Sequence, residues 1–297
     1  MTSTDPLIII GAGLAGWTTA REFRKLDSTT PVLLITADGG HFYAKPSLSN
    51  AFAQKRTPEQ LVSTPAAKMV EAQNVTLLAH TRALAIQPAT RSITTSKGEF
   101  RYSQLVLATG AQPIRVPVAG NAADAVQSVN SLDDFTRFYT QLTDTHLTGE
   151  PQRQKHVLIM GAGLIGCEFA NDLVASGYAV TVADPSTGPI AALLPLEAST
   201  QLRDALADLG VRWHFGATVK AVNKVTIGGA SAGHLQVELS NGQVALVDAV
   251  LSAIGLRADT SLAQAAGLIC ERGVVVDAAL QTSAPHIYAL GDNAQYA

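Results

Sequence analysis

The sequence lacks the marks of a metal, disulfide, nucleic-acid or membrane protein. Two of its 297 residues are cysteines, Cys167 and Cys270, and neither belongs to a Cys-x-x-Cys pair. A zinc site or an adjacent redox disulfide is therefore disfavoured, and a buried structural thiol is expected for Cys167. The seven histidines have no ligand spacing, so no metal site is predicted. A net charge of −3 gives no basic excess for nucleic acid.

Long apolar runs are also missing. No basic segment followed by a long apolar stretch opens the chain, so neither a signal peptide nor a membrane span is expected, and the cytoplasm is the default location. Charged residues make up 15% and hydrophobic residues 47%, a balance that favours a substantial core over disorder. The length leaves room for two domains.

What the chain does have is one glycine motif twice. GAGLAG at residues 11–16 follows the apolar run 7–10, and GAGLIG at 161–166 follows the apolar run 157–160. In this fingerprint the first glycine allows a tight strand-to-helix turn, the second lets the backbone approach a pyrophosphate, and the third allows close helix–strand packing. The helix N-terminus then offers N–H groups to the phosphates.

The paired motifs predict that one chain holds two dinucleotides, an arrangement suited to passing electrons between them. A tight turn without a ligand is the alternative for either motif alone. The residues expected to line the two pyrophosphate sites are Gly11, Gly13, Leu14, Ala15 and Gly16 in the first motif and Gly161, Gly163, Leu164, Ile165 and Gly166 in the second.

Two further pairs of segments repeat at nearly the same offset as the glycine motifs. The run 105–110 matches 250–255, and the turn 96–98 matches 240–242, where Asn-Gly is a strong hairpin signal. Self-similarity at a fixed offset predicts two copies of one architecture. Alternating strands and helices indicate parallel sheets with antiparallel inserts.

The expected elements follow from apolar periodicity and from helix-start and helix-stop signals. We expect strands at 7–10, 31–35, 105–108 and 178–183, and a segment at 282–290 that ends in another strand. We expect helices at 14–26, 59–72, 132–145, 164–177 and 196–209, a loop at 38–50 and a domain crossing at 111–118. Ser131 is the expected N-cap of the helix at 132–145.

An acidic residue ends the second strand of the second repeat. Asp184 lies where a carboxylate hydrogen-bonds an adenine-ribose 2′-hydroxyl. A 2′-phosphate would meet repulsion of at most roughly 4 kcal/mol at 4 Å and an effective dielectric of 20, and even half of that exceeds a tenfold preference. NADH is therefore expected over NADPH, unless Asp184 is merely a solvated carboxylate. In the first repeat Thr36 holds this position; Asp38 is a looser ribose candidate or an ordinary turn residue.

These motifs, together with TSAPHIYALGD at 282–292, occur in the order seen in FAD/NAD(P)-dependent pyridine nucleotide-disulfide reductases, which the chain resembles along essentially its whole length. Closer still, HFYAKPSLS at 41–49 and GAGLIGCEFAND at 161–172 resemble the rubredoxin–NAD reductases. The resemblance implies an α/β protein with two Rossmann-like, three-layer ββα dinucleotide-binding domains. An NAD domain at 118–255 would be inserted into an FAD domain formed by 1–117 and 256–297.

The resemblance also implies roles for single residues. Lys45 would stabilise charge on the reduced flavin and Glu168 would face the nicotinamide; a surface lysine and a carboxylate at a favourable helix start are the alternatives. Asp292 would bind the FAD ribityl chain or cap a helix. Relatives that act through thiols carry a redox cysteine near Lys45, and this chain has none. Pro46 would lie near the flavin, and the remaining implied cofactor contacts are Ala83, Ala108, Thr109, Gly110, Gly255 and Gly291.

The implied activity is hydride transfer from NADH to FAD, with electrons leaving singly to rubredoxin or a related small iron protein. Ferredoxin, flavorubredoxin or oxygen as acceptor stays open, as does a nucleotide-binding form without turnover. The sequence ends five residues after Asp292, where relatives continue into a helix and an interface domain. We therefore expect that domain to be absent and the flavin pocket to be open on one side. The oligomeric state cannot be read from the sequence.

Overall fold

The computed structural model describes residues 5–143, 154–227 and 230–296. Packing divides the chain into two units. The first comprises 1–44, 62–112 and 256–297, and the second comprises 45–61 and 113–255. Across the described ranges no helix combines the length and the apolar character needed to cross a bilayer.

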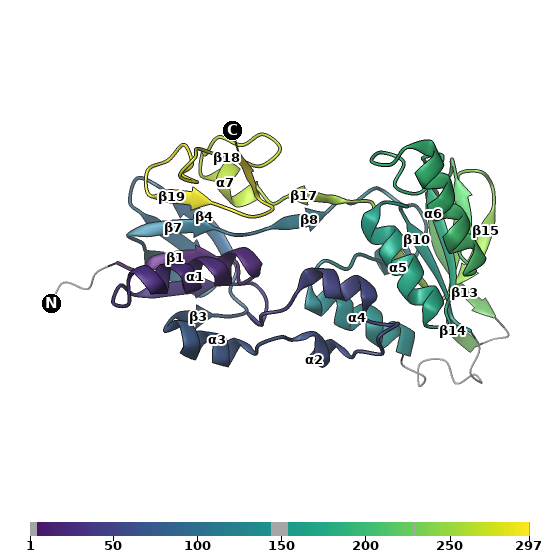
Figure 1. Ribbon diagram of the computed structural model, residues 1–297, viewed down its shortest axis with the longest axis horizontal. Helices are drawn as coiled ribbons and strands as arrows, with labels where there is room; N and C mark the ends of the chain where they lie inside the picture. Colours follow the sequence, from purple (N-terminus) through teal and green to yellow (C-terminus); the bar gives the residue numbers. More distant parts are fainter. Residues whose placement is uncertain (1–4, 144–153, 228–229, 297) are drawn as a thin grey trace. The chain divides into compact units, whose positions relative to one another are not determined.

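A five-stranded parallel sheet forms the centre of the first unit (Figure 1). Its order is β19-β7-β1-β2-β3, with bounds β1 (Leu7–Ile10), β2 (Val32–Ile35), β3 (Thr76–Leu78), β7 (Gln104–Leu107) and β19 (Ile287–Ala289). Every residue of β1 and β2 is buried, as expected for strands covered on both faces.

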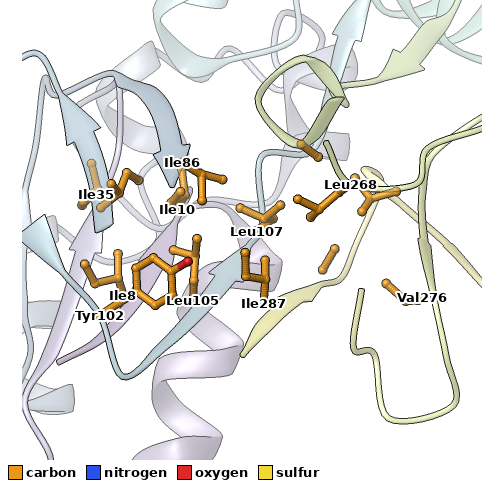
Figure 2. Packing of buried hydrophobic residues seen from close by; sticks show 14 of the residues in the cluster. Ile8, Ile10, Ile35, Ile86, Tyr102, Leu105, Leu107, Leu268, Val276 and Ile287 are labelled. Carbon is orange, nitrogen blue, oxygen red and sulfur yellow. The ribbon is translucent and has the colours of Figure 1, made fainter. Parts of the chain in front are cut away.

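Alternation along β1 sends side chains to both faces of this sheet. Ile9 packs with Trp17 of α1 (Leu14–Leu26) and with side chains of α3 (Ala66–Gln73). Ile8 and Ile10 point to the opposite face of the sheet. There they belong to a buried cluster that also contains Ile86, Tyr102 and Leu268 (Figure 2). Helices cover one face and an antiparallel layer the other, which confirms the expected three-layer ββα architecture.

The second unit repeats this plan. Its parallel sheet has the order β12-β11-β10-β16-β9, with bounds β9 (Val126–Gln127), β10 (His156–Met160), β11 (Ala179–Asp184), β12 (Arg212–Phe215) and β16 (Ala249–Ser252). Read from the other edge, the order β16-β10-β11-β12 repeats β7-β1-β2-β3, and β9 takes the outer position that β19 has in the first sheet. The helices are α4 (Leu132–Thr143), α5 (Leu164–Ala175) and α6 (Leu196–Asp208).

Each unit also carries a three-stranded antiparallel sheet at the same point of the repeat. These are β4 (Ala83–Gln87), β5 (Ser92–Thr95) and β6 (Gly98–Arg101) in the first unit and β13 (Val219–Ile227), β14 (Ala230–Leu239) and β15 (Val244–Val247) in the second. The expected hairpin turns are confirmed: Gly98 has φ +126° and Gly242 has φ +83°, values that favour glycine.

Shorter elements complete the fold. They are η1 (Lys45–Asn50), α2 (Pro58–Leu61), β8 (Ala111–Pro113), η2 (Ala123–Ala125), β17 (Leu256–Ala258), α7 (Ser261–Ala265), β18 (Val274–Val276) and β20 (Ala294–Tyr296). The expected cap of α4 is confirmed, because the Asp134 backbone N–H donates to Ser131 Oγ at 3.1 Å. The predicted end of that helix, at 144–145, lies outside the described residues.

Two expectations about the first hundred residues are wrong. The continuous helix predicted at 59–72 is two helices, α2 and α3, separated by residues 62–65. Pro65 disfavours a helical residue before it, and the N–H groups of Ser63 and Thr64 both donate to Phe42 O instead. The loop predicted at 38–50 ends in the 3₁₀ helix η1.

The segment 1–117, predicted as the first part of the FAD domain, is divided between the two packing units. Residues 45–61 pack with the second unit. Asp172 of α5 binds the backbone N–H groups of Phe52 and Ala53, and the Phe52 ring lies in a cluster of aromatic side chains. The second unit ends at Gly255, and the domain bounds 1–117, 118–255 and 256–297 stay predictions.

Candidate dinucleotide-binding sites

The first glycine motif separates residues needed for packing from one that leaves space. Gly11 has φ +108°, and a Cβ there would lie 2.1 Å from Ala108 O. A Cβ on Gly16 would lie 1.8 Å from Gly11 O. A Cβ on Gly13 would meet none of the described atoms within 4 Å. The first and third glycines therefore serve the chain's own packing, while the second leaves the backbone open to a ligand.

The second motif has the same geometry. Gly161 has φ +102°, with its Cβ position 2.6 Å from Ala253 O, and that of Gly166 lies 2.1 Å from Gly161 O. Gly163 has open space. Gly13 and Gly163 are the N-caps of α1 and α5, and neither helix start has a side-chain cap within the described chain. Uncapped N–H groups at a helix start are suited to binding phosphate.

Exposed apolar side chains flank both helix starts. Leu14 is 69% exposed, Leu164 55% and Ile165 43%. These side chains lie beside the open glycines in sequence, where a bound dinucleotide would cover them. The arrangement is one reason to treat both helix starts as ligand sites rather than as tight turns alone.

Several predicted segments meet around the first motif. Ala108, directly after β7, provides the carbonyl that excludes a side chain at Gly11. Thr109 Oγ1 donates to Asp259 O at 3.0 Å. A Cβ on Gly291 would lie 3.0 Å from Ala15 Cβ, which places residue 291 against the motif.

For the other predicted cofactor-binding residues, all within the described ranges, the structure gives a position but no contact with the glycine motifs. Asp292 is exposed, and Ala83 begins β4 and packs against the core. Gly110 and Gly255 follow corresponding strands and have φ +71° and +107°. Their roles as cofactor contacts stay predictions.

The two acidic candidates differ in setting. Asp38 Oδ1 accepts from Thr36 Oγ1 at 2.7 Å and from Gly40 N at 2.9 Å, the geometry of a turn residue. Asp184 binds the second motif itself, because its Oδ2 accepts from Ala162 N at 2.6 Å and its Oδ1 from Ser186 N at 2.7 Å. The backbone thus orients the Asp184 carboxylate beside the motif, where a ribose would bind.

Cys167 is buried in the first turn of α5, as expected for a structural thiol. Its Sγ donates to Ala162 O at 3.4 Å. Burial, followed by the negative charges of Asp184 and Glu168, raises the pKa of Cys167 to about 11. At neutral pH the group is a thiol, which is the unreactive form.

The two residues with predicted catalytic roles, Lys45 and Glu168, both belong to the second unit. Lys45 Nζ donates to Asn130 Oδ1 at 3.0 Å. Glu168 is exposed one turn into α5, and its Oε2 accepts from Ser49 Oγ at 2.5 Å. Pro46 also lies in this region, since its carbonyl oxygen is 3.2 Å from Ser49 Oγ, whose proton the closer Glu168 carboxylate accepts. The catalytic roles given to Lys45 and Glu168 stay predictions.

The residues present fit two dinucleotides. Each motif offers an uncapped helix start and an open glycine where a pyrophosphate would approach. The second also offers an oriented carboxylate for a ribose hydroxyl.

Comparison with known proteins agrees with this geometry. The family model described as pyridine nucleotide-disulphide oxidoreductase matches residues 5–297. The chain belongs to this family. Membership confirms the expected α/β fold and the expected class, an NADH-dependent flavoprotein oxidoreductase, with FAD and NADH as its cofactors.

Individual relatives are similar over nearly the whole chain. The rubredoxin-NAD(+) reductase of Alcanivorax borkumensis is 42% identical over 98% of this chain and 72% of its own length. The nitric oxide reductase FlRd-NAD(+) reductase of Aeromonas salmonicida is 39% identical over 98% and 71%. A solved covalent putidaredoxin reductase–putidaredoxin complex superposes with a TM-score of 0.86 at 28% identity, covering 99% of this chain and 69% of that chain.

Three polar residues near these sites escaped the sequence analysis. Ser49 and Asp172 bind partners 119 or 120 positions away, and no local pattern marks such contacts. Asn293 is fully buried and donates to Leu107 O at 3.2 Å, while its Oδ1 has no partner among the described residues. A polar residue beside Asp292 was the available signal, and it does not distinguish a buried side chain from an exposed one.

Proposed function

We propose that this protein is a reductase that takes a hydride from NADH and passes electrons singly to rubredoxin or a similar small iron protein. The duplicated motif carries the proposal: one chain presents two helix starts with an open second glycine and no side-chain cap among the described residues. When bound, FAD would supply the two-electron chemistry that links a hydride donor to a one-electron acceptor.

The glycine motif of the first unit would bind FAD and that of the second unit would bind NADH. Gly13 would admit one pyrophosphate and Gly163 the other. Asp184 would accept a hydrogen bond from the adenine ribose and disfavour a 2′-phosphate. Glu168, held by Ser49, would orient the nicotinamide. FAD contacts by Lys45, Pro46, Asp38 and Asp292 belong to the same proposal, as does the assignment of 118–255 as the NAD domain.

Names of relatives support an iron protein as acceptor. Two similar enzymes are named for rubredoxin and for FlRd, and a similar reductase was solved bound to putidaredoxin. The cysteines favour electron transfer directly from the flavin rather than through a dithiol. Cys167 is buried with a raised pKa, and Cys270 belongs to the first unit. A dithiol relay between flavin and acceptor has no paired thiols here. A cytoplasmic location stays a prediction.

An anaerobic titration tests the proposal. The purified chain, supplied with FAD, is titrated with NADH while flavin absorption is followed, and rubredoxin is then added. We expect bleaching at one NADH per flavin, followed by reoxidation as rubredoxin is reduced. A flavin that bleaches but reduces ferredoxin, flavorubredoxin or oxygen far faster than rubredoxin would change the acceptor. No FAD uptake would leave a nucleotide-binding form without turnover.

A further inference from the structure

Helix α5 holds the segment 45–53 at two points one turn apart. Glu168 accepts from Ser49 Oγ, and Asp172 accepts from the backbone N–H groups of Phe52 at 2.9 Å and Ala53 at 2.8 Å. Residues four apart lie on the same helix face, so both carboxylates contact the same short segment of chain. Glu168 is exposed, while Asp172 is 2% exposed.

The hydrogen bonds to Asp172 are not needed merely to hold Phe52 against the second unit. Phe52 already packs against Phe135, Phe138, Tyr139 and Tyr178, with ring centroids 5.5–5.9 Å apart. Burying a carboxylate is costly unless it is well hydrogen-bonded. Burial raises the pKa of Asp172, although the N–H groups of Ala53 and Phe52 lower it.

Two N–H bonds from successive residues to one carboxylate add orientation to the packing of Phe52. They fix the direction in which the chain leaves η1, and Ser49 lies three residues before Phe52. We propose that Asp172 is a positioning residue: it orients the segment 45–53 so that the Ser49 hydroxyl holds the Glu168 carboxylate in place for the nicotinamide. This rests on the proposed function of Glu168.

The chain offers variants that separate positioning from stability. Asp172→Asn keeps the shape but turns one acceptor into a donor that faces a backbone N–H. Ser49→Ala removes the hydroxyl that Asp172 is inferred to place. Phe138→Leu weakens the aromatic cluster without touching either hydrogen bond, so it is a destabilised control. Asn171→Ala changes an exposed side chain next to Asp172 on α5 and is the matched neutral control.

Anaerobic stopped-flow reduction of the FAD-loaded full chain is the first readout. At saturating NADH we expect Asp172→Asn and Ser49→Ala each to reduce flavin about tenfold more slowly, because small misplacement of a reacting pair is costly. The Kd for NADH should change by less than about twofold, because the glycine motif is untouched. In a double-mutant cycle, Asp172→Asn should have no further effect once Ser49 is alanine. The neutral control Asn171→Ala should reduce flavin at the wild-type rate per bound flavin.

Amide hydrogen exchange of the FAD-free chain is the second readout and needs no turnover. Asp172→Asn should raise exchange at 49–53 and leave the strands β10 and β11 protected. Exchange raised throughout the second unit, as in Phe138→Leu, would show a general stabilising role and overturn the proposal. Unchanged reduction in Asp172→Asn, or additive effects with Ser49→Ala, would overturn it as well. If wild type itself fails to reduce flavin, the proposed function fails, whereas the exchange at 49–53 still decides whether Asp172 holds the segment.

Discussion

Replacing the second glycine of each motif by alanine separates ligand binding from folding. Gly13 has φ −76° and ψ −169°, and Gly163 has φ −74° and ψ −172°, all allowed for alanine. Neither added Cβ would meet a described atom within 4 Å. Gly13→Ala and Gly163→Ala should therefore fold, whereas Gly16→Ala would place its Cβ 1.8 Å from Gly11 O.

The expected free-energy changes in the ligand-free chain nearly cancel. Alanine restricts the unfolded state and gains about 0.4–1 kcal/mol. As a helix N-cap it is poorer than glycine and loses a similar amount. Gly13→Ala and Gly163→Ala should thus change the free energy of unfolding by less than about 1 kcal/mol. Gly16→Ala must displace helix from strand and should cost several times more.

Ligand affinity should respond in the opposite way. A methyl group at Gly13 occupies the space through which a pyrophosphate reaches the backbone. We expect FAD affinity to fall at least about tenfold, or about 1.4 kcal/mol, with NADH affinity unchanged. Gly163→Ala should weaken NADH and spare FAD. Thermal melts of the FAD-free chain and fluorescence titrations with each cofactor measure both effects. Wild-type FAD affinity in Gly13→Ala, or loss of the wrong cofactor, would refute the assignment of the two helix starts.

Further predictions concern three other residues. Asp184→Asn should raise the ratio of NADPH to NADH turnover about tenfold by removing the like charge; an unchanged ratio in steady-state assays would count against a ribose site there. Since the folded pKa of Cys167 is raised to about 11 from 9, its contribution is intact below pH 9 and is lost as pH rises from about 9 to 11, by roughly 2–3 kcal/mol. Urea melts of wild type and Cys167→Ala across that window measure it, and parallel curves would contradict the shift. Ser131→Ala should cost about 1 kcal/mol of stability by removing the cap of α4; Thr143→Ala, at the far end of that helix, is the control in the same melts.

The parallel sheets and the glycine turns follow from local sequence. The apolar runs Leu7–Ile10 and Val157–Met160 are buried, and each is followed by a glycine, Gly11 or Gly161, whose positive φ and close packing require it. Duplication made these signals stronger, because the same order of run, turn and hairpin occurs twice. The order of four strands of the second sheet could therefore be expected from the first, but not its outer strand β9, which comes before β10 in the chain.

Contacts between segments that are distant in the chain could not be predicted from the sequence. No sequence pattern near Phe52 indicates that its N–H group donates to Asp172, which lies 120 positions later. The apolar periodicity at 59–72 does correspond to helices, but the helix is interrupted. Pro65 disfavours a helical residue before it, and the N–H groups of Ser63 and Thr64 donate to the Phe42 carbonyl instead of to a helix. Local pattern predicts elements, whereas the partner that captures a loop depends on the folded arrangement.

The two sheets obtain their outer strands from opposite directions along the chain, and this gives biosynthesis an order. β9 precedes β10, so the second sheet has all its strands once Ala249–Ser252 has left the ribosome. The first sheet must wait for Ile287–Ala289 to pair with Leu105–Leu107. Until then β7 presents an unpaired edge, the kind of surface on which strands of other chains can add. That edge is therefore unpaired throughout the synthesis of residues 113–286, an interval in which shielding by chaperones would limit aggregation.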